Sequence, residues 1–146
     1  MIVDKFSGEY RWLSNFYPCD IVYGGVTYPS VEHAYVASKT LDIPTRANIL
    51  TMTAGQAKRY GRTIPIRDDW DDVKLNLMMD FVGQKFKNNI ELRKKLIDTT
   101  CTIVEGNTWN DTFWGMCNGK GQNMLGRIIM TVRCELQIED MFYGFN

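Results

Sequence analysis

The sequence predicts a helix-dominated α+β protein with a small sheet, and three observations support this fold class. Apolar residues recur at helical spacing between residues 71 and 86 and again between residues 125 and 136. Two short β-prone runs flank Gly24-Gly25, which is a two-residue hairpin signal. The composition is that of a folded protein, with 45% hydrophobic and 23% charged residues among 146. A chain of this length can bury its own core, so we expect a single domain over residues 1–146.

The first half of the chain is expected to hold a hairpin followed by short helices. Residues 21–23 and 26–28 read as paired strands. Ser30 is a suitable N-cap for a helix over residues 31–41. Residues 44–60 follow with one or two further short helices.

The second half is expected to hold the longer helices. An amphipathic helix over residues 71–86 would turn one apolar stripe inward, made of Leu75, Met78, Met79, Val82 and Phe86. A shorter helix follows to about residue 97, and residues 102–105 read as a brief strand. A loop rich in glycine and asparagine then leads to the last helix, whose inward stripe is Leu125, Ile128, Ile129, Val132 and Leu136.

Charge and composition exclude several kinds of protein. Seventeen basic residues balance seventeen acidic ones, which argues against a protein that coats DNA, although a local basic groove is compatible with it. One histidine and four widely spaced cysteines do not match the usual zinc-ligand spacing, so we expect no metal and no cofactor. There is no signal core, and no apolar run reaches the length of a membrane span. We therefore expect a cytoplasmic protein with no membrane partner.

Glu32 and Lys39 form the first candidate site. In a helix, steps of three, four and seven residues keep Glu32, Tyr35, Val36 and Lys39 on one face. Glu32 and Lys39 would be roughly 10 Å apart along the axis, which is too far for a direct ion pair but suits two groups that flank a ligand. The same spacing fits a solvated face on which Glu32 simply matches the helix dipole. Spacing alone favours the solvated face.

A second cluster of acidic, aromatic and glycine residues lies in the last third of the chain. The glycine-rich segment 115–126 leads into a helix, where backbone amides could hold a phosphate, although it is not a Walker A loop. Glu105 and Asp111 could act as acid and base, or serve as a cap and a surface charge. The tryptophans could stack on a base or pack in the core; they are Trp70, Trp109 and Trp114.

Together these motifs resemble the NADAR family, also called YbiA-like. The resemblance runs from Phe6 to about Leu136 and keeps the order and spacing of many short motifs. They are Leu13-Ser14-Asn15-Phe16, Tyr28-Pro29-Ser30-x-Glu32-His33 with Lys39, Gly61-Arg62, Trp70-x-x-Val73-Lys74, Lys85-Phe86, Leu92-Arg93-x-x-Leu96, Val104-Glu105, Asp111-x-x-Trp114-Gly115 and Gly119-Lys120-Gly121-x-Asn123-x-Leu125-Gly126. The resemblance implies a YbiA-like fold.

The resemblance also implies an N-glycosidase, an enzyme that cleaves the bond between a ribosyl carbon and a nitrogen. Two substrate classes are associated with the family: ribosylamino-pyrimidinone phosphates of early riboflavin synthesis, and ADP-ribose attached to guanine. The partner is therefore a small ribosyl-phosphate or ADP-ribosyl molecule, or ADP-ribosylated nucleic acid, and the neutral net charge favours the small molecule. Where Gln-Ala-x-Lys-Phe is common in the family, this chain has Val36-Ala37-Ser38-Lys39-Thr40, a difference that bears on substrate preference.

The resemblance assigns catalysis to Glu32, Lys39, Glu105 and Asp111. Lys39 would intercept an opened ribosylamine as a Schiff base or contact the ribose, and Glu32 would stabilise the cationic sugar carbon. Glu105 or Asp111 would move the proton. The expected substrate-binding residues, gathered around one cavity, are Asn15, Phe16, Arg62, Trp70, Trp114, Gly115, Lys120 and Asn123. Arg62, Lys120 and the amides near Asn123 would hold phosphate. The alternatives are an ADP-ribose or nucleotide-binding module without catalysis and a structural helical protein.

Overall fold

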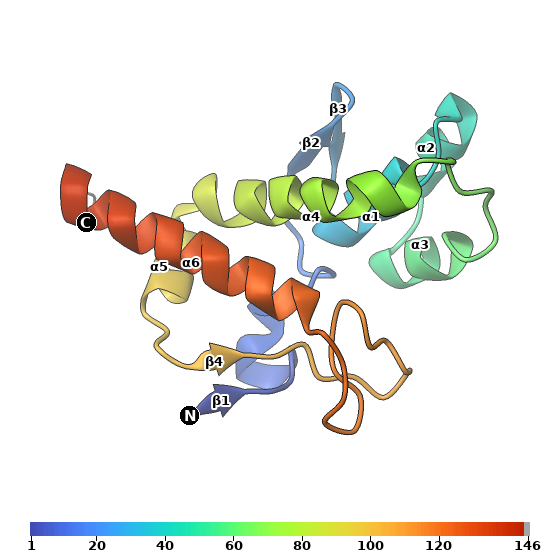
Figure 1. The fold of residues 1–146 in the computed structure, drawn as a ribbon. Coiled ribbons are helices and arrows are strands. Elements are labelled where there is room, and N and C mark those ends of the chain that lie inside the picture. The colour runs from blue at the N-terminus through green and yellow to red at the C-terminus, as the bar shows by residue number, and fades with distance from the viewer. Residues whose placement is uncertain (145–146) are drawn as a thin grey trace. The chain divides into compact units, whose positions relative to one another are not determined.

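The structure, a computed structural model, describes residues 1–144 and divides into two compact units. The middle unit is Asn15–Lys85, and the terminal unit combines Met1–Ser14 with Phe86–Asn146. Helices dominate the described part of the chain, and its strands form two short pairs (Figure 1). The predicted helix-dominated α+β class is therefore confirmed. The single domain over residues 1–146 stays a prediction.

The middle unit begins with a hairpin and continues with helices. Its elements are β2 (Ile21–Tyr23), β3 (Val26–Tyr28), α1 (Val31–Ser38), α2 (Ile43–Ile49), α3 (Ala54–Tyr60) and most of α4 (Trp70–Lys87). Strands β2 and β3 pair antiparallel with Val22 opposite Thr27. Both hairpin glycines have positive φ, 57° at Gly24 and 77° at Gly25, as a tight two-residue turn requires. The hairpin prediction is confirmed.

Helix α1 is the centre of the middle unit. All eight of its residues are buried, and it contacts α2, α3 and β2. Ser30 caps its start, because the Ser30 side chain accepts a hydrogen bond from the His33 N–H at 3.1 Å. The helix ends at Ser38, with Lys39 as its C-cap, three residues before the predicted end. Because the whole helix is buried, the solvated-face reading of Glu32 does not hold.

Helix α4 follows the predicted range but turns a different set of side chains inward. Its buried residues are Trp70, Met78, Phe81, Val82, Gly83, Lys85 and Phe86. Met79, which we expected inside, is 42% exposed, whereas Phe81 is fully buried. The reason is the 3.6-residue period: Phe81 lies three residues from Met78 and four from Lys85, so it falls in the middle of the stripe.

The terminal unit pairs strands from the two ends of the sequence. Its elements are β1 (Ile2–Val3), the short 3-10 helix η1 (Gly8–Leu13), α5 (Ile90–Ile97), β4 (Thr102–Ile103) and α6 (Met124–Tyr143). Strands β1 and β4 run parallel, with Val3 opposite Ile103 (Figure 1). The sequence pattern does not predict β1, because two residues are too few to show a period.

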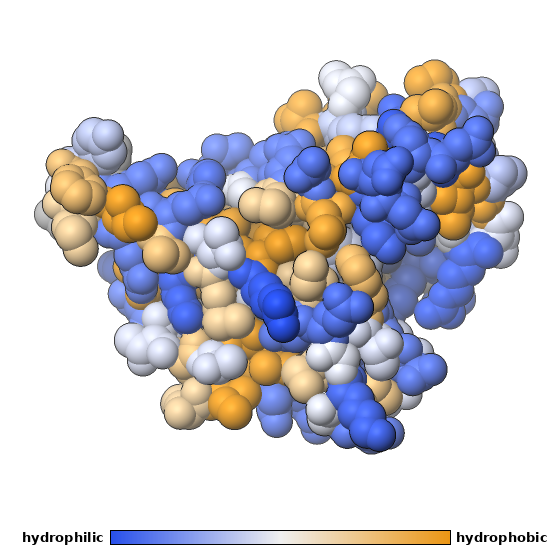
Figure 2. All heavy atoms as spheres, in the orientation of Figure 1, coloured by the Kyte–Doolittle hydropathy of each residue, from blue (hydrophilic) through white to orange (hydrophobic). Residues whose placement is uncertain are grey.

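Helix α6 packs against α5 and β4 with the predicted stripe, since Leu125, Ile128, Ile129, Val132 and Leu136 are all buried. It runs past the predicted end to Tyr143. Met141 and Phe142 at this end are exposed. Figure 2 shows apolar side chains among the polar ones on one face of the molecule. Among residues 1–144, no helix combines the length and the apolar character that crossing a membrane requires.

Candidate active site

The predicted site residues fall into two groups, one in each unit. The group in the middle unit is built on the first turn of α1. Glu32 is 9% exposed, and its backbone N–H donates to the carbonyl of Asn15 at 3.0 Å. The Asn15 amide in turn lies 3.7 Å from the sulfur of Met78 on α4. The loop that carries Asn15 and Phe16 is thus anchored to the backbone of Glu32 at the start of α1.

Lys39 lies at the other end of α1, on an aromatic surface. Its Nζ is 5.1 Å from the ring centroid of Tyr35, one helical turn earlier. The Tyr35 ring packs against Trp70, with 5.2 Å between centroids and a tilt of 58°. Trp70 is 9% exposed and therefore supports Tyr35 from within the fold. Tyr35 belongs to the same face but was not among the predicted site residues.

Two further candidates of the middle unit are exposed. Phe16 is 42% exposed, and the Lys58 ammonium lies 5.8 Å from its ring centroid. Arg62 follows α3, and its backbone N–H donates to the Arg59 carbonyl at 3.2 Å. The Arg62 side chain is exposed, so it is open to an anionic ligand.

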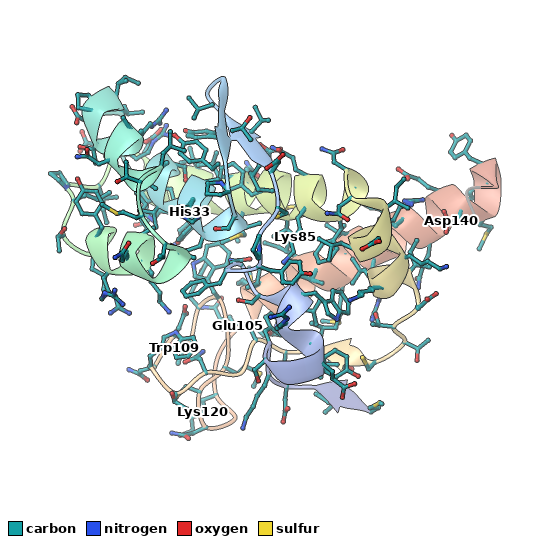
Figure 3. All side chains as sticks on the ribbon, turned by 180° about the vertical axis from the view of Figure 1, so that it is seen from behind. His33, Lys85, Glu105, Trp109, Lys120 and Asp140 are labelled. Atoms are coloured by element: carbon teal, nitrogen blue, oxygen red, sulfur yellow. The ribbon has the colours of Figure 1, made fainter. Side chains whose placement is uncertain are left out.

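The second group lies in the terminal unit and is built on Glu105, two residues after the end of β4 (Figure 3). The Glu105 backbone N–H donates to Asn123 Oδ1 at 2.9 Å, and Asn123 Nδ2 donates to the Ile103 carbonyl at 3.0 Å. Asn123 has a left-handed backbone, with φ of 52°, and its side chain makes no capping bond to α6. The Asn123 amide therefore holds the end of β4 and positions Glu105.

Gly115 leaves the space that the Glu105 side chain occupies. A Cβ at Gly115 would clash with both Glu105 Oε2 and the Glu105 carbonyl oxygen, and would lie 2.7 Å from Asn107 Nδ2. The same Asn107 nitrogen donates to Glu105 Oε2 at 3.3 Å. Gly115 is thus required for the position of the Glu105 carboxylate. This structural role does not depend on a contact between Gly115 and a ligand.

Asp111 organises the turn that carries Trp114. Its Oδ1 accepts from the backbone N–H groups of Phe113 at 3.1 Å and Trp114 at 2.9 Å. Asn107 brackets the Asp111 backbone, accepting its N–H at 3.0 Å and donating to its carbonyl at 2.8 Å. The half-buried Trp114 ring meets Phe113 edge-on, with centroids 4.8 Å apart. One carboxylate oxygen of Asp111 is therefore engaged in holding the loop.

The predicted phosphate seat at the start of α6 is wrong. Four successive backbone amides donate to carbonyls of the preceding loop: Gln122 to Thr112 at 2.8 Å, Asn123 to Gly115 at 3.2 Å, Met124 to Phe113 at 3.0 Å and Leu125 to Trp114 at 2.9 Å. Because these donors are already satisfied, they do not form an anion site. Lys120, the other phosphate candidate nearby, is exposed at a turn that begins at Cys117 (Figure 3).

His33 has a structural role. Both ring nitrogens of His33 are bonded: Nδ1 lies 2.6 Å from Ser30 Oγ, and Nε2 lies 2.7 Å from the Met52 carbonyl. In the part of the chain that the structure describes, no group of three or more histidine, cysteine, aspartate or glutamate side chains gathers that could hold a metal ion.

Lys85 is a buried amine that was not among the predicted site residues. It is 2% exposed, and its Nζ lies 5.7 Å from the ring centroid of Tyr17 (Figure 3). Burial lowers the pKa of Lys85 to about 7, and the neighbouring Cys19 thiol opposes this shift. Helical spacing is the signal that could have found it, since Lys85 lies on the buried stripe of α4 with Met78 and Val82.

The titration of Lys85 should make the stability of the protein depend on pH. The pKa of Lys85 in the folded chain is about 7, below its ordinary value of 10.5. Between these two pH values the unfolded chain therefore binds more protons than the folded chain. The free energy of unfolding should therefore rise, by roughly 1–2 kcal/mol between about pH 7 and about pH 8.5. Urea unfolding across this range should show the rise in the wild type and in the control Lys94→Met, whose lysine is exposed. An equal rise in Lys85→Met would contradict the assignment.

Comparison with known proteins identifies the fold and then the family. The chain is similar to the NMR structure of the Escherichia coli protein YbiA, with a TM-score of 0.83 and 34% identity over 97% of this chain and 87% of that one. Both are helix-dominated proteins with the YbiA fold. The family model of the NADAR domain matches residues 4–137, so the chain belongs to the NADAR family.

Relatives with assigned names agree with this membership. N-glycosidase YbiA of Escherichia coli (strain K12) is 36% identical over 137 residues, which cover 91% of this chain and 86% of the relative. N-glycosidase YbiA of Shigella boydii is 37% identical with the same coverage. Riboflavin biosynthesis protein VVA0006 of Vibrio vulnificus is 40% identical over 88% of this chain, which spans only 36% of that relative's length. The chain is thus an N-glycosidase, a hydrolase that acts on N-glycosyl compounds, as the resemblance implied.

Proposed function

We propose that this N-glycosidase hydrolyses the N-ribosidic bond between a ribose phosphate or ADP-ribose and a guanine-like or pyrimidinone base. The observation that carries the proposal is the arrangement on α1: a buried carboxylate, Glu32, and an amine, Lys39, lie two helical turns apart on one face. The names of the relatives support the substrate class, since one group is named for N-glycosidase activity and another for riboflavin biosynthesis.

The reaction proceeds through the open form of the ribosylamine. Ring opening gives an imine between C1 of the sugar and the nitrogen of the base. The neutral Lys39 amine adds to C1, and its two N–H protons pass to the nitrogen of the base. The base then leaves as an amine, and a C1=N bond to Lys39 remains. Water then adds to C1 and releases the sugar and the lysine amine. Glu32 stabilises the positive charge that develops at C1 and on its nitrogen.

Within this reaction we assign proton transfer to Glu105 rather than Asp111. Asp111 Oδ1 accepts two backbone hydrogen bonds and holds the loop of Trp114. Glu105 is held in place through its backbone N–H, which donates to Asn123, and its Oε2 accepts a 3.3 Å bond from Asn107 Nδ2. Glu105→Gln should lower turnover with an unchanged melting temperature, whereas Asp111→Asn should lower the melting temperature. Reversed outcomes would exchange the two roles.

Lys39→Ala tests the covalent step. Borohydride reduces a C=N bond to a stable amine, so wild-type enzyme incubated with substrate and borohydride should gain the mass of the sugar on Lys39. The adduct should be absent in Lys39→Ala, and turnover should fall by about 100-fold or more. Lys94→Ala removes an exposed lysine and should keep both adduct and turnover. A fully active Lys39→Ala enzyme would end the assignment.

The substrate class is tested by comparing the two kinds of substrate. Purified protein is incubated with a ribosylamino-pyrimidinone phosphate and, separately, with an ADP-ribosylated guanine oligonucleotide, and release of the base is measured. Because the net charge is zero, we expect the free metabolite to be cleaved with the higher kcat/KM. Binding of either compound without cleavage would contradict the proposed activity.

A further inference from the structure

The last turn of α1 is held by two arginines from outside the helix. Arg46 Nε donates to the carbonyls of Ala37 at 3.1 Å and Thr40 at 2.9 Å. The backbone N–H of Arg67 donates to the carbonyl of Lys39 at 2.7 Å, and its Nη1 makes a longer bond to Ser38 at 3.5 Å. Guanidinium and amide donors thus bond the carbonyls at the end of the helix, where the regular hydrogen-bond pattern stops.

Tyr23 of β2 joins the two arginines. Its hydroxyl oxygen accepts from Arg46 Nη2 at 3.1 Å and from Arg67 Nη1 at 3.3 Å. The Arg46 guanidinium also lies over the Tyr23 ring, 4.7 Å from its centroid. The Asp69 carboxylate accepts two hydrogen bonds from Arg67, one from Nε at 2.6 Å and one from Nη2 at 2.9 Å. We call Arg46, Arg67 and Tyr23 the arginine clamp.

The arginine clamp stabilises the C-terminal end of α1, which has little stability of its own. An isolated helix of eight residues is marginal, and α1 has no basic residue in its own last turn. Lys39 is the C-cap, so the direction in which its side chain leaves the helix follows the backbone of Ser38 and Thr40. The clamp bonds carbonyls on both sides of Lys39 and the Lys39 carbonyl itself.

We propose that Arg46 and Arg67, joined through Tyr23, are positioning residues that hold Lys39 in the orientation in which its amine meets the sugar carbon. The inference rests on the proposed function of Lys39. It goes beyond that function because it assigns a role to the two arginines that bond the end of the helix and to the tyrosine that joins them. A small displacement of a reacting group costs much more in turnover than in binding.

Arg67→Ala and Arg46→Ala are the first test. We expect kcat to fall by about 10- to 100-fold with a smaller change in KM, and the yield of the borohydride adduct to fall with it. Guanidinium ion added to the solution should restore part of the turnover of both variants and none in Lys39→Ala. Arg67→Lys keeps the charge but loses the planar fork, so it should retain only part of the wild-type kcat.

Tyr23→Phe and Lys94→Ala complete the set. Tyr23→Phe removes only the oxygen that joins the arginines, so it should fold and still lower kcat. If circular dichroism shows that Arg46→Ala or Arg67→Ala does not fold, the kcat of Tyr23→Phe tests the clamp in its place. Lys94→Ala removes an exposed charge and should keep the wild-type kcat. If Lys39→Ala is inactive while folded clamp variants keep wild-type kcat and adduct yield, the clamp inference is overturned and the proposed function stands. If Lys39→Ala is fully active, the proposed function itself fails.

Discussion

Replacement of Glu32 by glutamine is expected to lower kcat by about 100- to 1000-fold while the chain stays folded. Glutamine has nearly the size of glutamate, and the backbone bond from residue 32 to the Asn15 carbonyl does not involve the side chain. What is lost is the negative charge, which is worth most in a buried position such as this one, 9% exposed. Steady-state kinetics on a ribosylamine substrate measures the effect.

Glu91→Gln is the matched control for this experiment. Glu91 also lies in the first turn of a helix, α5, but it is exposed. Both substitutions remove a charge that matches a helix dipole, so the loss of Glu91 should cost about 0.3–1 kcal/mol of stability without changing turnover. A wild-type kcat in Glu32→Gln, or an equal loss in Glu91→Gln, would show that the Glu32 charge has no specific part in the chemistry.

The sequence predicted those parts of the fold that local patterns determine. The long helices α4 and α6 each repeat an apolar stripe over several turns, and the turn at Gly24-Gly25 requires positive φ, so both kinds of element show in single-sequence patterns. The pairing of β1 with β4 joins residues about one hundred positions apart. Nothing in the local sequence encodes that separation.

The candidate site was predictable in part for the same reason. The 3.6-residue period is enough to put Glu32 and Lys39 on one face of α1, but it does not tell whether that face is buried. Burial of α1 depends on α2, α3 and β2 around it. The roles of Arg46 and Arg67 depend on hydrogen bonds to backbone carbonyls of another element, and no residue pattern predicts such bonds.

Asn123 shows how the structure can assign a residue a role that its sequence context does not indicate. The resemblance marked it as a binding residue, and glycine-rich context suggested free amides for phosphate. In the structure its side chain bonds the Glu105 N–H and the Ile103 carbonyl, and the amides around it are occupied. The motif alone does not tell which role Asn123 has, whereas its hydrogen bonds show that it supports the backbone around Glu105.

The second large effect is expected from Gly115→Ala. The added methyl group would meet the Glu105 carboxylate, the Glu105 carbonyl and Asn107 Nδ2, all within a buried turn. Because one of these neighbours is backbone, the clash cannot be relieved by a side-chain rotation alone. We expect a loss of about 3 kcal/mol or more in the free energy of unfolding, together with the loss of turnover that displacement of Glu105 brings.

Gly83→Ala is the control for Gly115→Ala, since Gly83 lies within α4 and a Cβ there meets nothing within 4 Å. It should leave stability unchanged or raise it by up to about 1 kcal/mol. Urea unfolding of both variants measures the difference.

A double variant then separates the two clashes at Gly115. Glu105→Ala removes the carboxylate but keeps the carbonyl, so Gly115→Ala should destabilise less in a Glu105→Ala background than in the wild type, yet still measurably. If the cost of Gly115→Ala is the same in both backgrounds, the carboxylate does not occupy the space that Gly115 leaves, and the position assigned to the Glu105 side chain is wrong. If the cost disappears entirely, the carbonyl contact is unimportant, and Gly115 serves the position of the Glu105 side chain alone.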